Sequence, residues 1–263
     1  MTSNLSQEEE NYMSAIALKD DIKLTPDILS ETAKKMTFEE YLLYVPSDDF
    51  KYELDQGELI QMTAATGLHT AICGFLEYEI QGFLVSQNLP LVGKSSVGVR
   101  TDIASSRIPD VIVCTESLWE SLVNRKGAGV LNTGENPELV IEVVSENRAT
   151  DYMKKRNEYA TINIPEYWIV DSQKERVRLL TLEGDEAGYK ERDFVKGENV
   201  VSLRFPGLVI PVDLILSPPV VENLRREKER QFLQVSQELD LEKQRAEKLA
   251  AKLREMGVNL DEI

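Results

Sequence analysis

The run Leu139–Val144 constrains the fold more than any other stretch of this 263-residue chain. It is apolar except for Glu142 and is long enough to form a buried strand. An ionised glutamate inside such a strand is costly unless a cation or a hydrogen-bond network compensates its charge. After a break at 145–147, the sequence predicts a helix with three charged residues and a tyrosine: Asp151, Lys154, Lys155 and Tyr159. We therefore expect a buried acid followed by a helix that carries lysines.

An upstream run, 108–113, repeats this pattern, because Asp110 opens an otherwise apolar strand. Two acids on two neighbouring buried strands are typical of a divalent-metal site, since hard cations bind carboxylate oxygens and magnesium keeps several waters. Such an ion activates water and stabilises the charge that develops on a phosphate. We therefore expect Asp110 and Glu142 to bind magnesium, with manganese as an alternative. The carbonyl of Val143 is a candidate third ligand.

Asp151, Lys155 and Tyr159 are spaced by four residues, so they share one face of the predicted helix. Lys154 points about 100° away from that face. A lysine ammonium beside the acids would orient a nucleophile or offset charge in a transition state. The alternative is that Asp151 and Lys155 form a surface ion pair, which contributes little to stability. In the metal-site interpretation Lys155 is catalytic, and Asp151 and Tyr159 have supporting roles.

The net charge of −16 argues against a nucleic-acid partner, because most nucleic-acid binders have a basic surface. Phosphate binding would need bridging metals or a local basic patch. The candidates for such a patch are Arg148, Lys154, Lys155 and Arg156. The same residues are equally compatible with a solvated helix face.

The composition predicts a cytoplasmic protein with no membrane contact. No apolar stretch approaches the roughly 20 residues of a membrane-spanning helix, and the N-terminus has no basic region followed by an apolar one. The two cysteines, Cys73 and Cys114, belong to no disulfide or metal motif. We therefore expect both to be reduced and to be small core residues.

The order of elements predicts a mixed α/β (α+β) domain over residues 31–218, after a flexible acidic N-terminus over 1–30. Thr37 and Glu40 have the spacing of a helix capping box. A hairpin is predicted from 91–103 and 108–114, with 104–106 as its linker. The further predicted elements are helices over 38–45, 69–86 and 116–124, and strands over 52–54, 58–62, 139–144, 167–171, 176–182, 189–195 and 200–203.

The last segment, 219–263, changes character and predicts a charged helix. Alternating steps of three and four residues define a coiled-coil seam, formed by Phe232, Val235, Leu239, Glu242, Ala246, Leu249, Leu253 and Met256. We interpret the seam as a surface for self-association into a homodimer or higher homo-oligomer. The alternative is a surface helix that folds back on the domain.

Several motifs together resemble the Uma family of restriction endonucleases, in the PD-(D/E)XK nuclease superfamily. They follow one another in order over residues 36–215, and the C-terminal charged helix resembles a tail of bacterial members. The matching pieces are Tyr52-Glu53-Leu54 with Gly57-Glu58-Leu59, His69, Pro109-Asp110, Pro137 to Ser145, Asp151 with Lys155 and Tyr159, and Glu166 to Asp171.

The resemblance implies a restriction-endonuclease-like mixed sheet flanked by helices, built on an α-β-β-β-α-β core. It also implies magnesium-dependent phosphodiester hydrolysis with nucleic acid as substrate, DNA rather than RNA. By position, Asp110 and Glu142 match the metal-binding acids of the superfamily, and Glu53 matches an additional acid. His69 either faces the site or only caps its helix.

The sequence departs from the superfamily pattern at one position. A lysine is expected two residues after the second acid, where this chain has Val144. The resemblance implies that Lys155, from the following helix, replaces that lysine in space. The alternative function is a non-catalytic interaction or regulatory protein that uses the nuclease fold as a scaffold and the terminal coiled coil for assembly.

Overall fold

The computed structural model describes residues 35–48, 50–144, 150–182 and 188–256, except for the side chain of Asp151. The segment 1–30, which the sequence predicts to be flexible, therefore lies outside the described part. The predicted supporting role of the Asp151 side chain lies outside it as well. Contacts divide the chain into two compact units, with the boundary after Leu216. The finer assignment of 31–218 and 219–263 to functional domains stays a prediction.

The centre of the first unit is a six-stranded mixed sheet in the order β11-β10-β9-β8-β6-β3. β8 and β9 run parallel, and the other neighbours are antiparallel. Both β8 and β9 are buried along their whole length, which explains why their sequences are nearly continuous apolar runs. The bounds are β3 Leu91–Lys94, β6 Val111–Thr115, β8 Leu139–Val143, β9 Glu166–Asp171, β10 Arg176–Thr181 and β11 Lys190–Val195.

A second sheet has five strands in the order β2-β1-β5-β4-β7. Its first two strands form a hairpin whose turn residues, Gln56 and Gly57, both have positive φ, as a tight two-residue hairpin turn requires. The bounds are β1 Tyr52–Asp55, β2 Glu58–Gln61, β4 Gly98–Asp102, β5 Ser105–Arg107 and β7 Val130–Leu131, and a separate pair comprises β12 Asn199–Val201 and β13 Val209–Pro211.

The predicted hairpin of 91–103 with 108–114 is confirmed only in part, because 91–94 pairs antiparallel with 112–115 and the rest of the first segment does not. The first segment is two strands, β3 and β4, which belong to different sheets, and the predicted linker contributes strand β5. The break falls at 95–97, where Ser96 has a φ of 60°. A positive φ at a non-glycine residue turns the chain out of an extended path. The chain therefore leaves the larger sheet after β3 and enters the second sheet at β4, which contains Val99.

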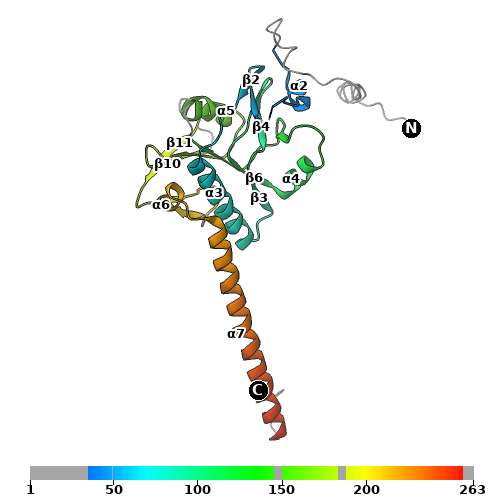
Figure 1. Ribbon diagram of the computed structural model, residues 1–263, viewed down its shortest axis with the longest axis vertical. Coiled ribbons are helices and arrows are strands. Elements are labelled where there is room, and N and C mark those ends of the chain that lie inside the picture. The colour runs from blue at the N-terminus through cyan, green and yellow to red at the C-terminus, as the bar shows by residue number, and fades with distance from the viewer. Residues whose placement is uncertain (1–34, 49, 145–149, 183–187, 257–263) are drawn as a thin grey trace, which may run out of the picture. The chain divides into compact units, whose positions relative to one another are not determined.

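Helices cover the larger sheet and connect its strands. α3 contacts β3, β6 and β8, and Figure 1 shows it lying across this sheet. The crossover between the parallel strands β8 and β9 has an unusual form, because a π-helical turn, η2, precedes the short α5. The helices are α2 Phe38–Leu43, α3 Gly67–Ser86, α4 Glu116–Val123, η2 Thr150–Lys155, α5 Arg156–Thr161, α6 Val212–Leu216 and, in the second unit, α7 Val221–Glu255.

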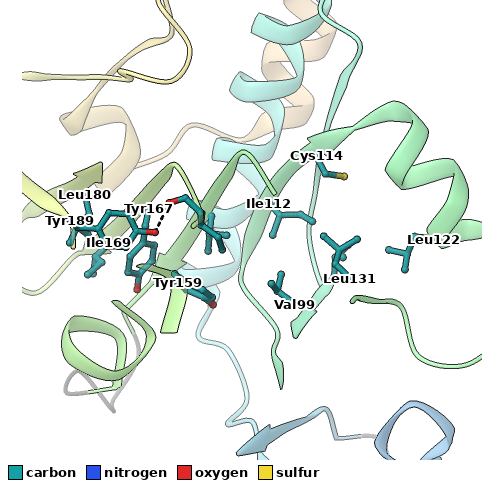
Figure 2. Packing of buried hydrophobic residues seen from close by; sticks show 13 residues of the cluster. Val99, Ile112, Cys114, Leu122, Leu131, Tyr159, Tyr167, Ile169, Leu180 and Tyr189 are labelled. Atoms are coloured by element: carbon teal, nitrogen blue, oxygen red, sulfur yellow. Dashed lines mark hydrogen bonds between the residues drawn. The ribbon is translucent and has the colours of Figure 1, made fainter. Parts of the chain in front are cut away.

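The main hydrophobic core lies between the larger sheet and the segments that cover it. Figure 2 shows Tyr159, Tyr167 and Tyr189 at one end of this cluster and Leu122 and Leu131 at the other. The rings of Tyr159 and Tyr167 meet edge to face, with centroids 5.1 Å apart. This packing fixes α5 against β9, so that the helix which follows β8 has a defined position.

None of the helices in the described ranges is both long enough and apolar enough to cross a membrane.

Candidate active site

Asp110 directly precedes β6, and Glu142 lies in the adjacent strand β8 of the larger sheet. The antiparallel register of β6 and β8 pairs Val111 with Ile141. Asp110 precedes Val111 and Glu142 follows Ile141, so both acids lie at the same end of this strand pair. Both carboxylates are near the thiol of Cys73, whose pKa their charges raise.

Glu142 is almost fully buried, with 4% of its surface exposed. Its Oε1 accepts a hydrogen bond from the Tyr159 hydroxyl at 2.7 Å and lies 2.9 Å from the Lys155 Nζ. Burial, and then the charge of Glu142, hold the pKa of Tyr159 well above its usual range, so this hydroxyl stays a donor. A cation and a hydrogen bond thus compensate the acid that interrupts the apolar strand.

Lys155 joins the two sheets. It is 7% exposed, and its Nζ lies 3.4 Å from Oε1 of Glu53 on β1 as well as 2.9 Å from Glu142 on β8. Val144, at the position where the resemblance predicts a lysine, directly follows β8. An ammonium that comes from η2 therefore lies against the second acid, although Lys155 is thirteen positions after Glu142 in the sequence.

Asp110 is held by the central strand β8 and contacts His69 of α3. Its Oδ2 accepts a hydrogen bond from the backbone N–H of Val143 at 2.7 Å, and its Oδ1 lies 3.3 Å from Nε2 of His69. The N-cap of α3 is Thr66, whose hydroxyl accepts the backbone N–H of His69. The helix is therefore capped by Thr66, and the imidazole of His69 is directed to the candidate site.

Cys73 lies one helical turn after His69, and its Sγ is 3.5 Å from the imidazole Nδ1. Burial raises the pKa of the Cys73 thiol, and the nearby charges of Asp110 and Glu142 raise it further. The expectation of a core cysteine is wrong for Cys73, which is partly exposed, whereas Cys114 is buried in the core. The i, i+4 spacing of His69 and Cys73 was the available sequence signal.

Arg107 is a second central cation, and sequence reasoning missed it. It is 1% exposed and forms a two-pronged ion pair with Glu158, with both contacts at 2.6 Å. It also reaches Asp55 at 3.0 Å and Glu53 at 3.4 Å. Glu53 in turn accepts the backbone N–H of Ile108. Arg107 thereby fixes the acid that contacts Lys155.

The proposed basic patch is neutralised where the structure describes it. Lys154 forms an ion pair with Asp55, and Arg156 lies 3.1 Å from Glu191. The remaining candidate, Arg148, lies outside the described residues. The helix that carries Lys155 thus presents cations that are already matched with acids.

The donor set around Asp110 and Glu142 is compatible with a hard divalent cation, because it offers carboxylate oxygens from adjacent strands. In the described part of the chain, Glu142 and Glu53 share the Lys155 ammonium instead of approaching Asp110 as a three-acid cluster. A different group of possible metal ligands does lie close together: one ligand atom each of His69, Cys73 and Asp110 lies within 4.8 Å of the others.

A mixed sheet flanked by helices, with paired acids on its central strands, defines a nuclease-like α+β class. A solved structure described as "a putative nuclease belonging to DUF820" from Anabaena variabilis has a similar fold. The TM-score is 0.56 at 18% identity, over 69% of this chain and 98% of that chain. At this identity the similarity concerns the fold, and it confirms the predicted fold class.

The family comparison is more specific. The Uma2 family, described as "Putative restriction endonuclease", matches residues 38–213, which is more than half of the chain. The protein therefore belongs to this family, and the resemblance inferred from its motifs is confirmed. No curated protein is similar enough in sequence to match it.

Proposed function

We propose that this protein is a magnesium-dependent endonuclease that hydrolyses phosphodiester bonds, with DNA as the preferred substrate over RNA. The observation that carries the proposal is the buried contact between Lys155 and Glu142, at 2.9 Å. It supplies a lysine beside the second acid even though Val144 occupies the superfamily's lysine position. Family membership supports the same class of reaction.

In this proposal Asp110, Glu142 and the carbonyl of Val143 would hold the divalent cation, with manganese as a substitute. The cation supplies Lewis-acid stabilisation of the negative charge that develops on the phosphate. Lys155 orients the attacking water and offsets charge at the scissile phosphate. Tyr159 keeps the Glu142 carboxylate in place through its 2.7 Å hydrogen bond.

Glu53 and His69 complete the proposed site. Glu53 lies 3.4 Å from Lys155, so the ammonium lies between two carboxylates. His69 Nε2 lies 3.3 Å from Oδ1 of Asp110 and restricts the rotation of this carboxylate. In a −16 chain, phosphate binding depends on the cation and Lys155 rather than on a broad basic surface.

The acids are tested by Asp110→Ala and Glu142→Ala. We expect each to abolish magnesium-dependent cleavage of DNA, because each removes a cation ligand. The measurement is cleavage of single- and double-stranded DNA and of RNA with and without magnesium, and circular dichroism checks that the variants fold. Equal activity in the wild type and both variants would assign the cleavage to a contaminant.

The lysine is tested by Lys155→Met against its neighbour Lys154→Met. Lys155 is buried between Glu53 and Glu142, whereas Lys154 contacts Asp55 and is largely exposed. We expect a loss of cleavage rate by about a hundredfold or more for Lys155→Met, the scale of removing one charge-stabilising donor. Lys154→Met should keep a rate within a few-fold of the wild type. Similar rates for the two variants would contradict the role of Lys155.

A second candidate function is that of a non-catalytic interaction protein. The observation that favours it is the neutralisation of Lys154 and Arg156 by acids of the same chain, which leaves few cations for phosphates. Calorimetric titration with magnesium and manganese separates the two functions. Metal binding that is lost in Glu142→Ala favours the nuclease. If the wild type binds neither metal, the non-catalytic interaction protein is favoured.

Self-association through α7 is the third part of the proposal. No residue of this 35-residue helix is buried in the single chain. Most of the larger apolar members of the predicted seam are exposed, with Phe232 at 72%, Val235 at 63% and Leu249 at 61%. A second copy of the helix would cover them in a coiled coil. Deletion of 220–263 should therefore lower the oligomeric state measured by light scattering.

A further inference from the structure

His69, Cys73 and Asp110 bring three different donor atoms together beside the proposed magnesium site. His69 and Cys73 lie one turn apart on α3, and Asp110 directly precedes β6. The contacts are 3.5 Å from Cys73 Sγ to His69 Nδ1 and 3.3 Å from His69 Nε2 to Asp110 Oδ1. One ligand atom from each residue lies within 4.8 Å of the other two.

The chemistry of this group differs from that of the two acids. Thiolate and imidazole are poor ligands for magnesium but are preferred by zinc and similar transition metals. Three protein ligands with one open position form the usual coordination of an accessible zinc ion. The group has two nitrogen or sulfur donors and one carboxylate, so its donor set selects the zinc class.

The spacing is close to what a tetrahedral ion requires. With zinc bonds of about 2.0–2.3 Å, the ligand atoms of one ion lie about 3.4–3.6 Å apart. One imidazole nitrogen serves an ion at a time, so side-chain rotation must bring the three ligand atoms, which lie within 4.8 Å of one another, closer together. The other oxygen of Asp110 is already held by the Val143 N–H at 2.7 Å, which orients this carboxylate as an outer-sphere hydrogen bond does in metal sites.

We propose that His69, Cys73 and Asp110 form a binding site for a zinc-class cation. Asp110 is shared with the proposed magnesium site, so the two ions compete for it. Zinc bound to this group withdraws Asp110 from the acid pair and inhibits cleavage. This last consequence rests on the proposed function, whereas the binding site itself does not.

The test uses cobalt(II) as a spectroscopic probe on the full-length protein. Cobalt bound to the group should give a thiolate-to-cobalt charge-transfer band, which ligation by carboxylates alone does not produce. Zinc should displace the probe, and excess magnesium should weaken its binding. Cys73→Ser should remove the band and weaken cobalt binding by about tenfold or more, because it replaces the soft ligand.

Two variants keep the result interpretable. Cys114→Ala removes the other cysteine, which is buried in the core, and should leave the band intact. Cys73→His replaces the thiolate by a second imidazole and should bind cobalt without the band. A cobalt-saturated wild type with no thiolate band overturns the proposal, and so does an unchanged band in Cys73→Ser. The cobalt spectra do not depend on cleavage activity. They therefore test the binding site separately from the Glu142→Ala cleavage assay, which tests the nuclease proposal.

Discussion

Arg107 and Lys155 hold two buried acids of the first unit, Glu53 and Glu142. Arg107 pairs with Glu158 and reaches Glu53, and Lys155 lies between Glu53 and Glu142. All the contacts of this network involve residues that are far apart in the sequence. Removing one member leaves a buried charge without its partner, which costs more than the pair contributes.

Arg107→Met should therefore lower the free energy of unfolding by about 3–5 kcal/mol, because the carboxylates of Glu53, Asp55 and Glu158 lose their common cation. Urea unfolding followed by circular dichroism measures this change. The matched control is Arg230→Met, whose partner Glu227 is an exposed i, i+3 neighbour. It should cost at most about 0.5–1 kcal/mol. A loss below about 1 kcal/mol for Arg107→Met would contradict the network.

At the scale of elements, the crossover after β8 explains how a displaced lysine reaches the acids. The backbone makes a π-helical turn over 150–155 before α5 begins at Arg156. Both Lys155 and Tyr159 contact Oε1 of Glu142 from successive turns. π-helical turns are rare and occur often at functional sites. The local geometry thus presents an ammonium and a hydroxyl to one carboxylate.

Glu166 anchors the other end of this crossover. It is fully buried at the start of β9 and accepts hydrogen bonds from the Trp168 indole and the Ser202 hydroxyl, both on Oε1. Its Oε2 accepts the backbone N–H groups of Leu203 and Arg204. Glu166 therefore has a structural role, and it ties β9 to the segment after β12.

The seam of α7 leads to a prediction about one acid. Glu242 occupies a seam position, where a second copy of the helix would bring two carboxylates together. Glu242→Leu should tighten self-association by tenfold or more, since a buried leucine contributes about 1.5–3 kcal/mol and about 1.4 kcal/mol is tenfold. Analytical ultracentrifugation measures it. Glu247→Leu, outside the seam, should have a smaller effect, and an equal effect would argue against a specific coiled coil.

At the scale of the whole molecule, an ion pair between two loops and another on the larger sheet make stability depend on pH. The Arg125 hydrogen bonds lower the pKa of Glu135, and the Arg178 hydrogen bonds lower that of Asp193. A lowered pKa in the folded state means that the unfolded chain binds more protons as the pH falls. These pairs therefore stabilise the protein above the ordinary values of 4.5 for Glu and 3.8 for Asp, and the stabilisation is lost as the pH falls through the lowered pKa.

We expect the urea midpoint to fall as the pH is lowered below about 5, as acids with lowered pKa become protonated. Glu135→Gln should reduce this dependence, because it removes one of the linked protons. Glu58→Gln, an exposed acid of β2, is the control and should leave the slope near that of the wild type. A midpoint that rises on acidification would reverse the sign of the linkage and contradict the ion-pair account.

The sequence by itself determined the local elements and the family. The capping box of Thr37 and Glu40, the apolar run of β8 and the amphipathic pattern of α3 each depend on neighbouring residues, so periodicity and side-chain chemistry predict them. The tertiary structure decided what spacing cannot encode. It split 91–103 between two sheets, and it brought Arg107 to Glu158 and Cys73 to Asp110. These contacts depend on how sheets and helices pack, because burial selects partners by distance in space and not along the chain.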